Sequence, residues 1–236
     1  SIKQSHMTYG TIHLVGNLAS IFSIFSYLPG LKIMRDIILS KSSESYSLFP
    51  YVAMLASSSV WLKYGLVRED FPLITVSCFS LSIQTTIVFV FYLFARHRGA
   101  IHFQLLLCML MVFPVLSYVR YSPNLDLAIE HLGVYCTAVS IVSYGSPLSA
   151  MSEVLRTKSS ESMSLSLIML NFITACLWLT YGTLVHDSNL TVPNFVGACL
   201  SCFQLGLICV FPSTKSAGSA GAADASKKSV GSLATV

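Results

Sequence analysis

The chain has 236 residues, of which 54% are apolar and only 10% carry a charge. Soluble domains usually carry about 25% charged residues, so this composition excludes an ordinary soluble protein. The net charge of +4 comes without a basic patch that interleaves aromatic residues, which argues against a nucleic-acid partner. The seven cysteines lack the spacing and histidine partners of a zinc site, so we expect no metal and no cofactor.

Seven apolar runs are long enough to cross a bilayer as helices, for which about 20 mostly apolar residues suffice. In chain order they are Thr8–Leu28, Leu48–Val67, Phe71–Ala95, Ala100–Arg120, Leu127–Met151, Leu165–Val185 and Leu190–Phe211. Backbone in lipid must satisfy its own hydrogen bonds, and the runs are too long for barrel strands. The sequence therefore predicts an all-α membrane protein with seven transmembrane helices.

Charge asymmetry predicts how the helices are oriented. The loops after the first, third and fifth runs, together with the C-terminal tail, hold ten of the 14 Lys and Arg residues. Positively charged loops stay in the cytosol, so we expect a cytosolic C-terminus and an outside or lumenal N-terminus. The membrane is the plasma membrane or an internal one. Residues 212–236 are rich in Ser, Ala, Gly and Lys, and we expect a disordered cytosolic tail there.

The chain also repeats itself. Lys41–Leu48 returns as Lys158–Leu165, and Trp61–Gly65 returns as Trp178–Gly182, with the same offset of 117 positions in both cases. We therefore expect two parallel three-helix bundles, residues 8–95 and 127–211, joined by a linker helix at residues 100–121. The extra span is needed because three crossings would otherwise invert the second half. Such repeats are typical of transporters, whose substrate site lies between the halves.

Three prolines lie near the predicted cytosolic ends of helices. A proline inside a helix removes one backbone hydrogen bond and bends the helix. Several apolar residues continue beyond Pro29 and Pro147, and we interpret both as hinges. For Pro50, a simpler interpretation is a place in the first turn of its helix, where proline is well tolerated.

Taken together and in order, these motifs resemble the SWEET family of sugar transporters. The matching features are Gly16-Asn17, Pro29, Lys41–Glu44, Pro50-Tyr51, Trp61–Gly65, Ser146–Leu148, Lys158–Glu161, Trp178–Gly182 and Pro193-Asn194. The resemblance extends from about Tyr9 to Phe211. It implies a bidirectional facilitative carrier, not an enzyme, that moves sugar down its gradient by alternating access. The substrate would be glucose, another hexose or sucrose, and a small carrier of this kind can form homo-oligomers in the lipid bilayer.

The resemblance also implies a set of substrate-binding residues. Asn194 and Trp178 match sugar-binding positions of the family, and Trp61 stands at the related position of the second helix. Ser77 replaces an asparagine of the family, and its hydroxyl offers fewer donors and a shorter reach. Independently, two tryptophans at equivalent repeat positions suit the faces of a sugar, while Asn and Ser suit its hydroxyls. The alternative for the tryptophans is an interfacial belt.

Gating residues follow from the same resemblance. Pro29, Pro50 and Pro147 match three of the four cytosolic prolines of the family, and the fourth position is Ser164. On the opposite side, Tyr64 matches a gate tyrosine, and Asp187 stands where relatives often carry an acidic residue.

Two absences favour a passive uniporter. No Asp or Glu lies deep in a predicted span, although proton-coupled transporters generally need such a group. No nucleotide-binding motif is present either. Two alternatives stay open. A seven-helix receptor shares the topology but predicts no internal repeat, and a membrane interaction protein without transport differs only in function.

Overall fold

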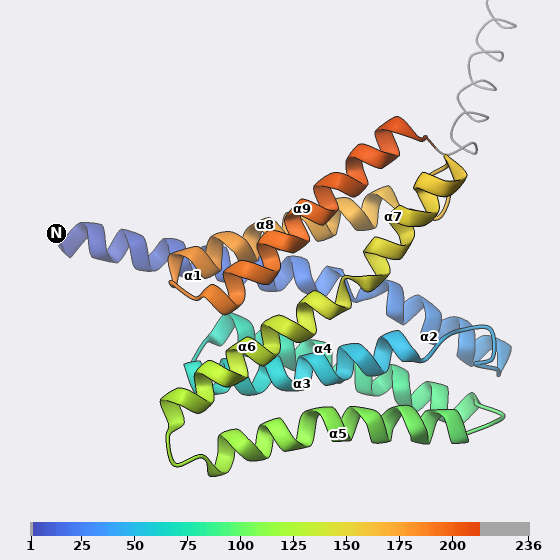
Figure 1. The fold of residues 1–236 in the computed structure, drawn as a ribbon, viewed down its shortest axis with the longest axis horizontal. Helices are drawn as coiled ribbons and strands as arrows, with labels where there is room; N and C mark the ends of the chain where they lie inside the picture. The colour runs from blue at the N-terminus through green and yellow to red at the C-terminus, as the bar shows by residue number, and fades with distance from the viewer. Residues whose placement is uncertain (1, 213–236) are drawn as a thin grey trace, which may run out of the picture.

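The computed structural model describes residues 2–212 and consists over that range of helices without strands (Figure 1). The predicted all-α fold is thus confirmed. The helices are α1 (Ile2–Phe25), α2 (Leu28–Ser40), α3 (Phe49–Arg68), α4 (Phe71–Phe94), α5 (Gly99–Tyr121), α6 (Leu125–Ser143), α7 (Gly145–Thr157), α8 (Leu165–Leu184) and α9 (Ser188–Val210). The predicted disordered tail, apart from residue 212, lies outside the described residues.

In the described part of the chain, nine helices make seven spans because two spans are interrupted. The apolar spans at residues 10–40 and 125–157 each break into two helices, α1 with α2 and α6 with α7. Pro29 is the second residue of α2, and Pro147 is the third residue of α7. Proline lacks the N–H that would bond to the carbonyl four residues earlier in a continuous helix. Those carbonyls belong to Phe25 and Ser143, the last residues of α1 and α6. Each break therefore falls just before its proline.

Beyond the first break, the helix continues further than the apolar run predicts. Lys32 and Arg35, which the sequence assigned to a loop, lie inside α2. Their charges do not end the helix because Gly30 and Ile37 on the same segment are buried against the rest of the protein. Charged side chains of this length can reach water from a helix that lies near the membrane surface.

One span differs from the rest in composition. Six spans are long and apolar enough to cross a membrane by length and composition alone, and α3 is not among them. It carries three consecutive serines, Ser57 to Ser59, together with Lys63 and Arg68. A helix with this many polar groups in a membrane is expected to face a cavity or a neighbouring helix, where these groups find partners.

The helices form two halves that contact each other in a crossed manner (Figure 1). In the first half, α4 packs against α1, α2 and α3; in the second, α9 packs against α6, α7 and α8. Between the halves, α1 contacts α8 and α3 contacts α6. The first helix of each half thus lies on the second helix of the other. The linker helix α5 packs on α3 and α6.

The buried core shows that the halves are joined at one end only. One cluster combines residues of both halves, including Val60 and Tyr64 with Leu132 and Trp178. Neither of the other two clusters joins the halves. One surrounds Ile37 in the first half and includes Ile101 of the linker helix α5, and the other consists of Met151, Val154 and Leu207 of the second half. We call the end with the loops of Asp70 and Asp187 the closed end, and the end with the loops of Lys41 and Lys158 the splayed end.

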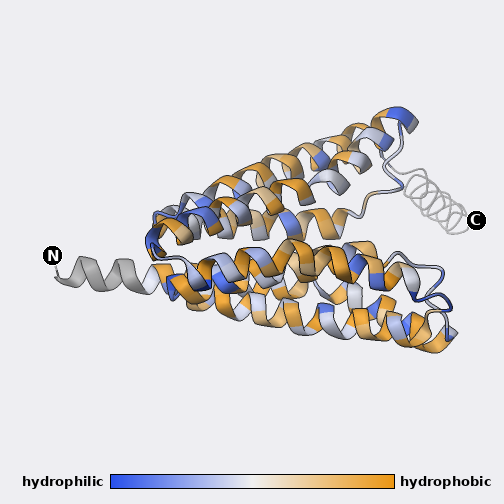
Figure 2. Cartoon of the chain, turned by 60° about the horizontal axis from the view of Figure 1, so that its bottom comes forward, coloured by the Kyte–Doolittle hydropathy of each residue, from blue (hydrophilic) through white to orange (hydrophobic). Residues whose placement is uncertain are grey.

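Hydropathy along the chain fits a bilayer position (Figure 2). Apolar residues cover the helical rods, whereas hydrophilic residues gather in the loops at the two ends, and the two layers of helices converge toward the closed end. On α5, the large side chains Phe103 and Phe113 are 62% and 72% exposed. Because such an apolar surface is unfavourable in water, α5 is suited to face lipid.

Candidate functional site

A cavity of about 220 Å³ lies between the two halves, next to the shared core. All four predicted substrate-binding residues line it, namely Trp61, Ser77, Trp178 and Asn194. They come from α3, α4, α8 and α9, so each half contributes two of them. The remaining lining residues are Ser23, Tyr27, Met54, Ser57, Ser58, Leu73, Val76, Ser80, Ser140, Tyr144, Leu190 and Pro193.

The two tryptophans occupy equivalent environments. Trp61 makes an edge-on contact with Tyr64, with ring centroids 5.7 Å apart, and Trp178 makes the same contact with Tyr181 at 5.6 Å. The indole N–H of Trp178 donates to the hydroxyl of Ser23 at 2.8 Å. The indole N–H of Trp61 donates to the hydroxyl of Ser140 at 3.2 Å. Both tryptophans are thus held by side chains of the opposite half.

The cavity combines apolar walls with uncharged polar groups, and none of its lining side chains carries a formal charge. Six serines and two tyrosines supply hydroxyl groups, and Asn194 supplies a carboxamide. One amide hydrogen of Asn194 bonds to the Leu190 carbonyl at 2.8 Å. A carboxamide has a second donor hydrogen and an acceptor oxygen, which are suited to a ligand. Such a site can bind a neutral ligand rich in hydroxyls, and its lining contains no carboxylate, imidazole, amine or thiol.

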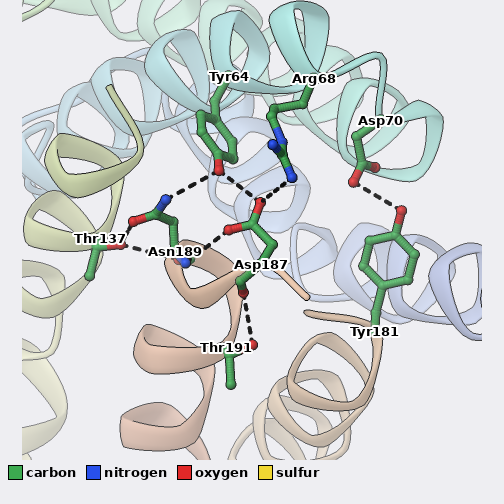
Figure 3. Close-up of polar contacts among 8 residues, drawn as sticks. All are labelled: Tyr64, Arg68, Asp70, Thr137, Tyr181, Asp187, Asn189 and Thr191. Carbon is green, nitrogen blue, oxygen red and sulfur yellow. Dashed lines mark hydrogen bonds and ion pairs between the residues drawn. The ribbon is translucent and has the colours of Figure 1, made fainter. Parts of the chain in front are cut away.

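At the closed end, two tyrosine–aspartate pairs connect the halves (Figure 3). The hydroxyl of Tyr64 donates to Oδ2 of Asp187 at 2.7 Å, and that of Tyr181 donates to Oδ2 of Asp70 at 2.9 Å. Each pair joins a helix of one half to the loop of the other. The two pairs are related by the repeat offset, as are the two tryptophan–serine pairs.

Helix capping explains why aspartates stand at these positions. Asp70 is the N-cap of α4, and its Oδ1 accepts from the backbone N–H of Leu73 at 2.9 Å. Asp187 is the N-cap of α9, and its Oδ1 accepts from the backbone N–H of Asn189 at 2.9 Å. Aspartate is a favoured N-cap because it satisfies an otherwise unpaired N–H group. Each carboxylate therefore caps its own helix with one oxygen and bonds the other half with the second.

The two pairs differ in their electrostatic surroundings. Nη2 of Arg68 lies 3.8 Å from Oδ2 of Asp187, and the repeat counterpart of Arg68 is the uncharged Val185. Asn189 adds a hydrogen bond from Nδ2 to the Tyr64 hydroxyl at 3.2 Å. At the other pair, burial raises the pKa of the Asp70 carboxyl above its ordinary value, while the hydrogen bonds from Leu73 and Tyr181 act in the opposite direction. Burial outweighs them because it penalises the charged form.

Two glycines allow the halves to approach at this end. A Cβ on Gly16 would lie 2.7 Å from both Pro72 and Tyr181. At the equivalent position of the repeat, a Cβ on Gly133 would collide with Asn189 and lie 3.0 Å from Tyr64. Contacts below about 3 Å between carbon atoms are repulsive. Any larger side chain at either glycine would therefore separate the helices that the tyrosine–aspartate pairs hold together.

The four predicted residues of the proline set all lie at helix starts. Pro29 and Pro147 follow the breaks described above. Pro50 stands in the first turn of α3, as in the simpler interpretation, and Ser164 is the N-cap residue of α8 without a side-chain capping bond. The structure places them in the splayed-end part of each half.

Sequence reasoning did not find Ser23, Ser140, Asp70, Tyr181 or Arg68. The repeat offset was the available signal for two of them, because Tyr64 and Asp187 lead by it to Tyr181 and Asp70. The same offset relates Ser23 to Ser140, but the sequence singles out neither of these serines. Arg68 has no counterpart, so nothing in the repeat pointed to it. Among the side chains that the structure describes, those of residues 10–212, no group of three or more from His, Cys, Asp or Glu could hold a metal ion.

Comparison with known proteins gives the family. The model of the family described as "Sugar efflux transporter for intercellular exchange" matches twice, at residues 13–99 and 130–216. Sugar transporter SWEET1 of Drosophila pseudoobscura pseudoobscura is 32% identical over 84% of this chain and 89% of its own length. Bidirectional sugar transporter N3 of Medicago truncatula is 30% identical over 83% of this chain and 75% of its own length.

The fold agrees with a solved structure. A eukaryotic SWEET transporter aligns with a TM-score of 0.81 at 24% sequence identity, covering 87% of this chain and 98% of that chain. This likeness supports the seven-span arrangement described above. Together, the twofold family match and the relatives at 30% identity or more decide the assignment: the chain belongs to the SWEET family of sugar transporters, which are not enzymes.

Proposed function

We propose that this protein is a bidirectional facilitative sugar uniporter, and that the cavity between the halves is its sugar site. The observation that carries this proposal is the cavity itself. It pairs two indoles from opposite halves with a rim of hydroxyls and one carboxamide, and its lining has no charge. Sugars combine apolar C–H faces with hydroxyl groups, and ligand sites typically pair apolar walls with a few placed polar groups.

The names of the relatives also support sugar transport as the function. Both the fly and the legume protein are named as sugar transporters, and the legume protein is named as bidirectional. The cavity volume of about 220 Å³ lies below the roughly 300–1,000 Å³ typical of drug-sized ligand pockets. A monosaccharide such as glucose suits this size better than a disaccharide.

Alternating access is the proposed mechanism. In the state described here, the tyrosine–aspartate pairs shut the closed end, and each half keeps a separate core at the splayed end. By the charge asymmetry of the loops, the closed end faces outside or the lumen and the splayed end faces the cytosol. Rocking of the halves about the bound sugar would open the first end and shut the second. The helix breaks before Pro29 and Pro147 are suited to absorb part of this motion.

The absence of charge in the cavity lining favours uniport over ion coupling. A proton-coupled carrier needs a titrating group that senses both the substrate and the proton. The carboxyl groups of Asp70 and Asp187 lie at the closed end and are not among the cavity-lining residues. The sugar gradient alone would then set the direction of flux.

The test is two-way flux of labelled glucose in proteoliposomes that contain the purified protein. We expect saturable flux in both directions, driven by the sugar gradient and unaffected by a proton gradient. Asn194→Ala should abolish most of this flux because the carboxamide is lost from the cavity. Phe195→Ala is the matched control, since Phe195 is the next residue on α9 and is 57% exposed on the outer surface.

Each alternative predicts a different result. A seven-helix receptor or a membrane interaction protein would give no flux above that of empty vesicles, with glucose, other hexoses and sucrose all tested. Flux that requires a proton gradient would contradict uniport while leaving the sugar site intact. Equal losses in Asn194→Ala and Phe195→Ala would contradict the assignment of the cavity.

A further inference from the structure

We propose that Ser23 and Ser140 are positioning residues of the sugar site, each of which orients the tryptophan that the opposite half contributes. This inference rests on the proposed function. In this arrangement neither half supplies the hydrogen-bond acceptor for the indole N–H of its own tryptophan. The complete pair of indole walls exists only while the two halves are in contact at the depth of the cavity.

The hydrogen bonds have a defined direction. An indole N–H is a donor only, and a buried tryptophan usually finds an acceptor for it. Trp178 is 7% exposed, and Ser23 is also 7% exposed. The Ser23 hydroxyl donates to the Ala19 carbonyl at 2.8 Å, so its oxygen is left to accept from Trp178. The two hydrogen bonds therefore run in one direction, from the Trp178 indole N–H to the Ser23 hydroxyl and from that hydroxyl to the Ala19 carbonyl.

The repeat makes the same arrangement twice. Ser23 and Ser140 occupy equivalent positions on α1 and α6, and Trp178 and Trp61 occupy equivalent positions on α8 and α3. These two bonds lie where α1 contacts α8 and where α3 contacts α6, the contacts that join the halves. The Trp178 bond at 2.8 Å is fully buried, whereas the Trp61 bond at 3.2 Å is only part-buried. Loss of Ser23 should therefore have the larger effect.

This geometry also assigns the role of each indole. Because both N–H groups are already used within the protein, the tryptophans contact sugar through their ring faces. The hydrogen bonds to sugar hydroxyls then come from Asn194 and from the serines of the rim. Without its serine, an indole loses the partner that fixes its rotation about the side-chain bonds, and the wall no longer has a single orientation.

Intrinsic fluorescence can test this directly, because Trp61 and Trp178 are the only tryptophans in the chain. In a Trp61→Phe background, all tryptophan emission comes from Trp178. We expect Ser23→Ala to shift this emission to shorter wavelength, because the indole N–H loses its polar partner. Ser23→Thr, which keeps a hydroxyl, should restore the original emission. Ser20→Ala is the matched control: Ser20 is a buried serine on the same helix that bonds the Pro72 carbonyl instead.

Sugar affinity is the second readout, measured with both tryptophans present. A hydrogen bond between neutral groups is worth about 0.5–1.5 kcal/mol, which corresponds to roughly a 2- to 10-fold change. We expect Ser23→Ala to raise the KM of glucose flux within this range, with Vmax changed less, and Ser140→Ala to raise it by a smaller factor. Ser23→Thr should return KM to the wild-type value.

The outcomes separate this inference from the proposed function. Emission that is the same in Ser23→Ala and Ser20→Ala would overturn the positioning role, as would an emission shift without any change in KM. Failure of the wild-type protein to transport any sugar would instead overturn the proposed function. The sugar-positioning role would fall with it, even if the emission shift were observed.

Discussion

Removal of the Tyr64 hydroxyl should open the closed end. In Tyr64→Phe, Asp187 loses its hydrogen bond of 2.7 Å and Asn189 loses an acceptor at 3.2 Å. A hydrogen bond to a charged group contributes about 1.5–3 kcal/mol. Asp187 keeps its bond from the Asn189 backbone N–H and gains water on opening, so the lower end of that range applies. About 1.4 kcal/mol is a factor of ten in an equilibrium constant, and we expect about tenfold more of the open form.

A native cysteine can report this opening. Cys136 is 0% exposed and belongs to the core cluster that joins the halves beside Tyr64. In a variant whose other six cysteines are replaced by serine or alanine, a membrane-impermeant maleimide added on the side that the closed end faces can react only when that end opens. We expect the labelling rate of Cys136 to rise about tenfold in Tyr64→Phe.

The control is the same chemical change at a site without a partner in the other half. Tyr121 is 82% exposed, and Tyr121→Phe should leave the labelling rate unchanged. An unchanged rate in Tyr64→Phe, with transport also unchanged, would refute the reasoning that the tyrosine–aspartate pairs hold the closed end shut. Faster labelling in both variants would indicate general loosening of the fold.

Three further predictions concern single positions. Gly16→Ala should also open the closed end, because the added Cβ overpacks the interface at a cost of about 1–3 kcal/mol. The labelling rate of Cys136 should therefore rise. Gly206→Ala is the control, since nothing lies within 4 Å of its added Cβ, and it should leave the labelling rate unchanged. Ser77→Asn should lower the KM for glucose about 2- to 10-fold through added hydrogen bonds; an unchanged KM would show that position 77 does not contact sugar. The raised pKa of Asp70 means that the folded, closed state binds its proton more tightly than an exposed aspartate. Its contribution to stability is therefore present at low pH and lost as pH rises through the raised pKa. Thermal unfolding in detergent from pH 4 to 7 should show this loss in the wild type, and Asp70→Asn should remove it.

The spans were predictable because apolar length is a local property of the sequence. The residues at which the spans end were less predictable. The predicted apolar run stops at Leu28, yet α2 begins there and continues through Lys32 to Ser40, because the buried Ile37 packs against the rest of the first half. Local composition does not record such a tertiary contact.

The cavity was predictable only as a set of residues. The resemblance identified Trp61, Ser77, Trp178 and Asn194, and the structure brings all four to one cavity. The resemblance could not identify Ser23 and Ser140, which accept hydrogen bonds from the indoles, because these contacts depend on how α1 crosses α8 and how α3 crosses α6. Ser23 looks like any other serine in an apolar helix until that crossing is known.

The crossed pairs have a consequence for how such a chain can arise and be divided. When residue i of one unit contacts residue j of a second, and residue j of the first contacts residue i of the second, the interface has the reciprocity of a twofold-symmetric homodimer. Tyr64 with Asp187 and Tyr181 with Asp70 obey this rule. The protein can thus be regarded as a tethered pair, with α5 as the tether that sets both copies in the same direction. Its two halves, expressed as separate polypeptides with α5 on either one, should reassociate through the same reciprocal contacts.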